Sequence, residues 1–171
     1  AFQTDPSGKS WTYLFVDMPA TREALRAYLD AQAKTADPLC HTLIDKSTGR
    51  AVGIASFMRI DANMGVIEVG NINYSERLKR TAVATEVMFL MMKRVFDELG
   101  YRRYEWKCDS LNHPSRKAAE RYGFVYEGTF RQAVTYKGRN RDTAWFSMID
   151  KEWPALKRAY EAWLDPANFD A

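Results

Sequence analysis

A strand-like run that leads through a small-residue loop into a long apolar helix constrains the fold most. The strand-like run covers Val66 to Asn73, and the loop and helix span Lys79 to Leu99. The loop reads Lys79-Arg80-Thr81-Ala82-Val83-Ala84-Thr85, two basic residues followed by mostly small side chains. Free N–H groups and the helix dipole favour an anion at the first turn of a helix, and small side chains let a phosphate approach the backbone. The loop is therefore predicted to bind phosphate.

The helix after this loop is apolar nearly all round, from Val87 to Met92. An amphipathic surface helix would show polar residues on one side, so this helix is predicted to be buried. A glycine, Gly100, is predicted to end it.

Composition narrows the class of protein. A chain of 171 residues with 46% hydrophobic and 27% charged residues fits one soluble domain, residues 1–171, with 1–10 disordered or left from a trimmed N-terminus. The net charge of +3 is too small to indicate nucleic-acid binding and is compatible with an anionic cofactor. No apolar run is long enough to span a membrane. Two cysteines, Cys40 and Cys108, make no disulfide framework and favour a cytoplasmic location.

The order of predicted elements is α–β–β–β–α–β–α–β–β–α, an α+β fold with a mixed sheet. The first three strands form an antiparallel meander, and the strand after the long helix pairs in parallel through a crossover. The predicted helices are Thr21 to Lys34, the long helix, a helix from Asn112 or His113 to Gly123, and Trp153 to Leu164; the predicted strands are Leu39 to Ile44, Ala51 to Ile60, Val66 to Asn73, Tyr104 to Cys108, Phe124 to Tyr136 and Thr143 to Ile149.

The loop Lys79-Arg80-Thr81-Ala82-Val83-Ala84 resembles the Gln/Arg-x-x-Gly-x-Gly/Ala signature of the GNAT superfamily of N-acetyltransferases. Lys79 replaces the Gln/Arg, and Ala82 replaces the first glycine. Over Leu39 to Ile149 the chain is similar to the RimJ/RimL-type branch, which acetylates N-termini of ribosomal proteins. The motifs that carry this similarity are Ala84-Thr85-Glu86, Phe96-Asp97-Glu98-Leu99-Gly100, Asn112-x-x-Ser115, Arg121-Tyr122-Gly123-Phe124 and Glu127-Gly128-x-x-Arg131.

The resemblance implies a GNAT-like fold: a mostly antiparallel sheet of six to seven strands, splayed in the middle, with helices on both faces. The family's usual first strand is not evident in residues 1–10. The implied function is transfer of an acetyl group from acetyl-CoA to a primary amine, a protein N-terminus or a small amine, by direct attack in a ternary complex. A non-catalytic acyl-CoA-binding module on the same fold is the alternative. Neither a nucleic acid nor a membrane is expected as partner, and the chain is expected to be a monomer or homodimer.

Glu68 is the first candidate for the general base, because its offset from the loop matches the base of the histone-acetyltransferase branch. A strand would place Glu68, Gly70 and Ile72 on one face, and apolar neighbours would raise the pKa of the glutamate. The alternative is a rim carboxylate paired with a basic side chain. Glu127 is the second candidate, since its strand borders the acceptor site in this family.

Gly70 and Asn71 are poor strand formers, which predicts a bulge in the middle of the strand. In the family such a bulge receives the pantetheine arm of the cofactor, and a freed N–H, here that of Ile72, faces the thioester carbonyl. Ser115 is the candidate acid for the leaving sulfur, because Ala119 stands where many members have tyrosine. Asn112 is expected to bind the pantetheine amides. The alternative for Ser115 is a first-turn helix serine that bonds to the backbone, and the alternative for Asn112 is a simple helix N-cap.

The acetyl-CoA-binding residues implied by the resemblance are Ile72, Lys79, Arg80, Thr81, Ala82, Val83, Ala84, Thr85, Asn112 and Ser115. No metal site is expected, because His113 and Cys108 lack the spacing of metal ligands. Three basic residues, Lys137, Arg139 and Arg141, are predicted to form a solvated hairpin tip, with contact to an acidic substrate or a nucleotide phosphate as the alternative.

Overall fold

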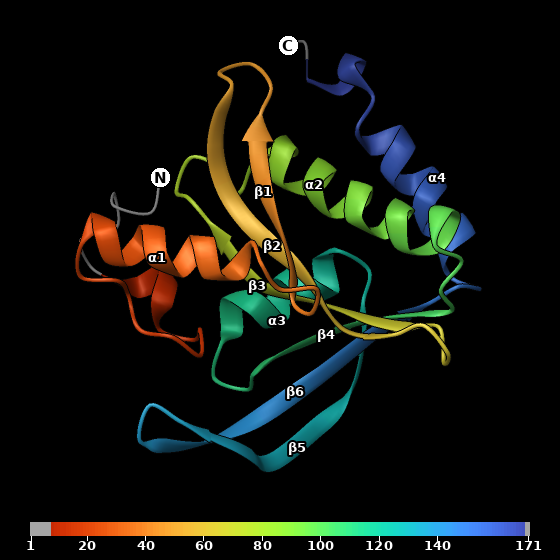
Figure 1. The fold of residues 1–171 in the computed structure, drawn as a ribbon. Coiled ribbons are helices and arrows are strands. Elements are labelled where there is room, and N and C mark those ends of the chain that lie inside the picture. The colour runs from red at the N-terminus through yellow and green to blue at the C-terminus, as the bar shows by residue number, and fades with distance from the viewer. Residues whose placement is uncertain (1–7, 170–171) are drawn as a thin grey trace.

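Six strands form one sheet in the order β1-β2-β3-β4-β6-β5 in the computed structural model, which describes residues 8–169 (Figure 1). Neighbouring strands are antiparallel except for β3 and β4, which are parallel, so the predicted mixed, mostly antiparallel sheet is confirmed. The strands are β1 (Leu39–Asp45), β2 (Arg50–Asp61), β3 (Val66–Tyr74), β4 (Arg103–Asp109), β5 (Val125–Tyr136) and β6 (Arg139–Ile149).

Four α-helices begin and end near the predicted bounds. They are α1 (Arg22–Gln32), α2 (Ala82–Lys93), α3 (His113–Arg121) and α4 (Trp153–Trp163). The short turns of helix are η2 (Lys9–Trp11), η3 (Arg94–Glu98), which extends α2 as a π-helix, and η4 (Pro166–Asn168). None of the helices within residues 8–169 is long and apolar enough to cross a membrane.

Side-chain caps fix where three of these helices begin. Thr21 accepts a hydrogen bond from the Ala24 N–H at α1, and Thr81 accepts one from the Ala84 N–H at α2. Asn112 caps α3. Each cap satisfies an N–H group that the helix itself leaves without a partner.

One face of the sheet carries the apolar core. Helices α2, α3 and α4 lie on this face, where α2 and α4 run side by side (Figure 1). Tyr122 of α3 donates a hydrogen bond to the Ala84 carbonyl of α2, and Tyr160 of α4 donates one to the Tyr122 carbonyl. These hydrogen bonds link α2 to α3 and α3 to α4, and all three helices pack on the same core of buried side chains.

The opposite face is polar in its centre and carries α1. Tyr28 of α1 packs edge-on against Trp11 at 5.9 Å between ring centroids, and burial raises its pKa with a smaller contribution from Cys40 of β1. Strand pairing aligns Glu68 with Glu105 and Glu105 with Ser147 across this face. We call this the polar face. The expected helices are therefore present on both faces, with three on the apolar face and α1 on the polar face.

The sheet splays between β3 and β4. Within residues 8–169, the pairing of these strands ends at Val69 and Trp106, although both strands continue. On the β2 side, Gly70 pairs with Ser56 and Asn73 with Ile54, so β3 has one extra residue there. Asn71 accommodates the bulge with a φ of 49°. The predicted splay and the predicted bulge are both confirmed.

Two expectations need correction, and one question stays open. The bulge reverses the alternation of β3, so Ile72 packs against the apolar core and not on the face of Glu68. Helix α2 is not buried all round, because Val83 is 42% and Leu90 53% exposed. Between residues 8 and 169 no strand precedes α1, and the question of a strand in residues 1–7 lies outside the described residues.

Candidate active site

The loop before α2 presents backbone N–H groups at the start of that helix. Arg80 has a φ of 62°, and Thr81 then caps the helix through Ala84. No hydrogen bond joins the N–H groups of residues 80–83 to another part of the described chain, residues 8–169. The Ala84 N–H is occupied, and Lys79 contacts Glu76 at 2.6 Å. Any anion here would therefore be held chiefly by the amides of residues 80–83.

The splay lies directly upstream of this loop. A Cβ atom on Gly70 would come within 2.2 Å of the Met58 sulfur, so a side chain here would require Met58 to move. Asn73 is 4% exposed, and its buried Nδ2 has no hydrogen-bond partner among the described residues. A buried amide without a partner is costly, which makes this strand end a candidate ligand contact.

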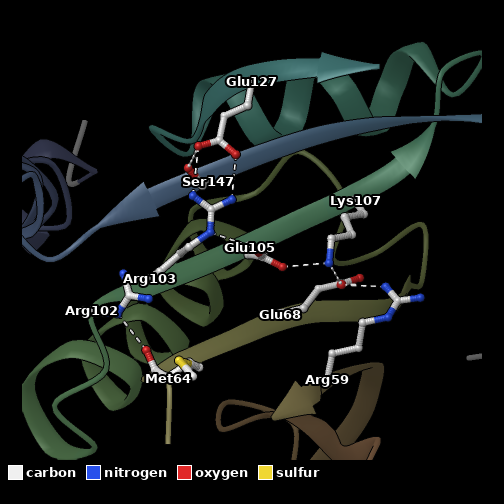
Figure 2. Close-up of polar contacts among 9 residues, drawn as sticks. All are labelled: Arg59, Met64, Glu68, Arg102, Arg103, Glu105, Lys107, Glu127 and Ser147. Carbon is white, nitrogen blue, oxygen red and sulfur yellow. Dashed lines mark hydrogen bonds and ion pairs between the residues drawn. The ribbon is translucent and has the colours of Figure 1, made fainter. Parts of the chain in front are cut away.

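Glu68 lies beside the splay on the polar face. It is 3% exposed, and its Oε2 contacts Arg59 Nη1 at 2.6 Å and Lys107 Nζ at 2.9 Å (Figure 2). The expected apolar neighbours are thus replaced by two cations. Glu68 therefore has features of both sequence interpretations. It is buried next to the splay, as expected for a base, and it is paired with basic side chains, as in the alternative.

The ion pairs continue across the polar face as a charge chain of alternating sign (Figure 2). Lys107 also contacts Glu105 at 2.7 Å, and Glu105 contacts Arg103 at 2.7 Å. Arg103 donates two hydrogen bonds to Glu127, at 2.9 and 2.6 Å. We call this set, Arg59, Glu68, Lys107, Glu105, Arg103 and Glu127, the charge chain. Its three carboxylates and three cations balance, so it adds no net charge to the face.

Glu127, the second candidate base, lies at the far end of the charge chain. The guanidinium of Arg103, with a smaller contribution from the Ser147 hydroxyl, lowers its pKa from 4.5 to about 2. A carboxylate with so low a pKa is a weak base at neutral pH. Glu127 lies in a bulge of the edge strand β5, which β6 separates from β4, and so it is away from the splay. Its position away from the splay favours Glu68 over Glu127 as the base.

The Arg103–Glu127 pair predicts a pH-dependent stability. Because the folded pKa of Glu127 lies below its unfolded value, the pair stabilises the protein above about pH 4.5, and this contribution is lost as the pH falls toward 2. We expect Glu127→Gln to reduce the free energy of unfolding by about 1 kcal/mol at neutral pH, since the pair is partly exposed. Urea unfolding between pH 7 and pH 2.5 should show this difference shrinking.

Glu120→Gln provides the matched control. Glu120 is exposed on α3 and makes no ion pair within residues 8–169. Its variant should differ from the wild type by a similar small amount at each pH. A Glu127→Gln difference that stays constant with pH would contradict the prediction.

Ser115 and Asn112 lie at the start of α3, on the apolar face. The Ser115 Oγ accepts a hydrogen bond from Trp106 Nε1 at 3.0 Å, which leaves its own proton available to donate. Burial raises the pKa of the Cys108 thiol nearby, and a hydrogen bond with Ser115 partly counters this. Asn112 Oδ1 caps α3 through the Ser115 N–H at 3.2 Å, which leaves Nδ2 for another partner.

Glu68 and Ser115 lie on opposite faces of the sheet. Glu68 is aligned with Glu105, whereas Trp106, the partner of Ser115, is the next residue of β4 and points the other way. A molecule touched by both side chains would have to lie in the gap where β3 and β4 part. The structure thus brings the predicted base and acid together only through the splay.

Of the three basic residues of the last hairpin, Lys137 is exposed as predicted, whereas Arg139 is half-buried and Arg141 is buried. Lys137 donates a hydrogen bond to the Trp11 carbonyl at 2.8 Å, and Arg139 pairs with Asp109. Arg141 is 6% exposed, because the hairpin folds back on the segment before α1. Among the described residues, His, Cys, Asp and Glu side chains form no group of three that could hold a metal ion.

Lys107 and Arg59 were missed by reasoning from the sequence, although one signal was available for the first. Arg103, Glu105 and Lys107 alternate with apolar residues along β4, a pattern that predicts one polar face. The pattern predicts a shared face, whereas the strand register determines that Lys107 meets Glu68. Arg59 has a φ of 49°, which no sequence pattern indicates.

The sequence and the structure are both similar to those of known acetyltransferases. A family model described as an acetyltransferase (GNAT) domain matches residues 1–125. The crystal structure of a GCN5-related N-acetyltransferase from Brucella melitensis superposes with a TM-score of 0.96 and 52% identity, over 99% of this chain and 77% of that one. A probable acetyltransferase of the GNAT family from Chromobacterium violaceum gives a TM-score of 0.83 and 40% identity, over 90% and 76%.

A relative found by sequence similarity is also named as an N-acetyltransferase. The chain is 29% identical over 112 residues, 66% of its length, to a protein named uncharacterized N-acetyltransferase p20 from Bacillus licheniformis. The match spans 62% of that relative's length. The RimJ/RimL-type branch stays a prediction.

Proposed function

This chain belongs to the GNAT acetyltransferase family, and we propose that it transfers an acetyl group from acetyl-CoA to a primary amine. The observation that carries the proposal is the parting of β3 from β4 after Val69 and Trp106, immediately before the exposed amides at the start of α2. A gap between strands that leads to a helix N-terminus suits a long ligand with a thioester at one end and a diphosphate at the other.

The residues around this gap fit acetyl-CoA as second substrate. In the proposal the amides of residues 80–83 hold the pyrophosphate, with the surrounding loop Lys79 to Thr85 shaping the site. Asn112 binds a pantetheine amide through Nδ2, because its Oδ1 is already used.

The proposed reaction forms one N–C bond and breaks one C–S bond. The attacking amine gives up a proton to Glu68, on the polar face. The N–H of Ile72, which follows the bulge, donates a hydrogen bond to the thioester oxygen as negative charge develops on it. Ser115, held in place by Trp106, supplies a proton to the departing sulfur from the other face and regains one from solvent when Glu68 releases its own. Lys107 and Arg59 keep the Glu68 carboxylate in position.

Calorimetry with CoA tests the binding half of the proposal. We expect Ala82→Glu to weaken CoA binding by about tenfold or more, because it adds bulk and negative charge at the helix N-terminus. Leu90→Glu is the matched control: it adds the same charge to the same helix, on the exposed side two turns away. Equal affinities for the wild type and Ala82→Glu, or no CoA binding at all, would contradict the proposed site.

Release of free thiol from acetyl-CoA in the presence of a panel of amines tests the catalytic half. The proposal predicts release that depends on the amine and one acetylated amine per thiol. CoA binding without thiol release from any amine would instead support the non-catalytic acyl-CoA-binding module.

A further inference from the structure

Arg141 is a buried cation with no carboxylate partner. It is 6% exposed, and its Nε donates a hydrogen bond to Thr143 Oγ1 at 3.2 Å. Its guanidinium carbon lies 5.0 Å from the Phe15 ring centroid and 5.7 Å from that of Tyr136. Within residues 8–169, no Asp or Glu forms an ion pair with Arg141. The two terminal nitrogens of its guanidinium are therefore left to bind something else.

The nearby carboxylate does not serve as the missing partner. Asp109 pairs with Arg139, accepts from the Tyr136 hydroxyl at 2.7 Å and accepts from the Leu111 N–H at 2.9 Å. Burial lowers the pKa of Arg141, and Tyr136 and Asp109 oppose this only in part. Burying an arginine without a counter-charge is costly, so its presence points to a role in binding.

Arg141 lies on the polar face, next to the splay. Arg141, Thr143, Trp145 and Ser147 are every second residue of β6 and so share one face of the sheet. Ser147 is aligned with Glu105, and Glu105 with Glu68, so this is the polar face. Asp109, the last residue of β4, pairs with Thr143, which puts Arg141 just beyond the end of that strand. This is the end at which β3 and β4 diverge. Glu68 also acts electrostatically on Arg141, in the direction that raises the pKa of the arginine.

Other unpartnered polar atoms lie on the same face. Ser56 is 0% exposed and Asn73 is 4% exposed, and neither Ser56 Oγ nor Asn73 Nδ2 has a partner among the described residues. The Trp145 Nε1 atom is also buried and without a partner there. Ser56 pairs with Gly70, and Asn73 follows the bulge, so both flank the splay. Polar atoms left unsatisfied on the same face as an unpaired arginine indicate that this face binds a polar ligand.

We propose that the amine acceptor carries a carboxylate, and that the terminal nitrogens of Arg141 bind this carboxylate while the amine reaches Glu68. The proposal rests on the proposed acetyltransferase function and names its substrate class, an amine with a carboxylate on the same small molecule. A guanidinium fork matches a carboxylate with two parallel hydrogen bonds. One unpaired positive charge beside Asp109 suits a singly charged group and disfavours a doubly charged phosphate.

The first test compares matched acceptors on the wild type. The panel is the L-amino acids, β-alanine and 4-aminobutyrate, each with its amide, which keeps the amine and removes the negative charge. At least one acid should be acetylated with a kcat/KM about 10- to 100-fold above that of its amide, the range for a hydrogen-bonded charge pair. Phosphoethanolamine against ethanolamine forms a second arm. Amides that react as fast as acids, or a preference only for the phosphorylated amine, would overturn the proposal.

The second test uses Arg141 variants with the same panel. Arg141→Gln should remove the preference for the acid over the amide, and Arg141→Lys should keep the charge and part of the preference. Arg158→Gln, an exposed arginine on α4 over the other face, is the control and should keep the full preference. A purely structural role for Arg141 would instead lower the rates for acids and amides equally.

Direct binding separates this proposal from the proposed function. If no amine releases thiol from acetyl-CoA, the proposed function fails. Calorimetry of the same acids and amides still tests whether Arg141 binds a carboxylate. Tighter binding of an acid than of its amide to the wild type, lost in Arg141→Gln and partly kept in Arg141→Lys, would support the carboxylate site. Equal binding of each acid and its amide to the wild type would overturn it.

Discussion

Glu68→Gln should lower kcat by about 10²- to 10⁴-fold, the usual contribution of a positioned general base. Glutamine keeps the shape of the side chain and can accept a hydrogen bond from Lys107, but it cannot take the amine proton. Affinity for CoA should change little, because Glu68 lies on the polar face and the amides of α2 lie beyond the splay. Steady-state kinetics with saturating amine, together with CoA calorimetry, measures both quantities.

Glu105→Gln is the control for this variant. Glu105 contacts the same Lys107, at 2.7 Å, and is likewise buried, so its loss disturbs the charge chain to a similar degree. It pairs, however, with Arg103, on the side away from the splay. If both variants lose the same activity, Glu68 acts only through the charge chain. A kcat for Glu68→Gln within about threefold of the wild type would contradict its role as base.

Local sequence features were sufficient to predict the parts of the fold that are local. Thr21 and Thr81 begin helices as caps because the capping bond spans only three residues. Gly70 and Asn71 interrupt a run of strand-forming residues, and the bulge occurs there. The place of the splay was implied by the family resemblance, which associates it with such a bulge, and β3 and β4 part there.

The exact register between paired strands, and the side-chain contacts that depend on it, could not be predicted. The contact of Lys107 with Glu68 depends on the register of β3 against β4, which no motif encodes. One inserted residue in β3 turned Ile72 to the other face, because side-chain direction has a period of two. Arg141 was placed at a solvated tip because the sequence does not show that Phe15 covers it.

A second large effect concerns Gly123, where α3 ends. Gly123 has a φ of +90°, and a Cβ atom there would lie 2.8 Å from Leu156 Cδ2 and 3.3 Å from its Cδ1. Gly123→Ala therefore combines a left-handed backbone, about 1–2 kcal/mol, with overpacking of about 1–3 kcal/mol. We expect the free energy of unfolding in urea to fall by about 2–4 kcal/mol, a large fraction of the stability of a typical domain.

Gly100→Ala separates the two contributions. Gly100 has a φ of +66° and no atom within 4 Å of its added Cβ, so only the backbone cost of about 1–2 kcal/mol applies. Truncation of the opposing side chain in Leu156→Ala should couple favourably with Gly123→Ala and recover part of its loss. Equal losses for Gly123→Ala and Gly100→Ala would show that α4 moves away freely. In that case the packing of α4 against the end of α3 would not fix the position of Ser115, which the proposed chemistry requires.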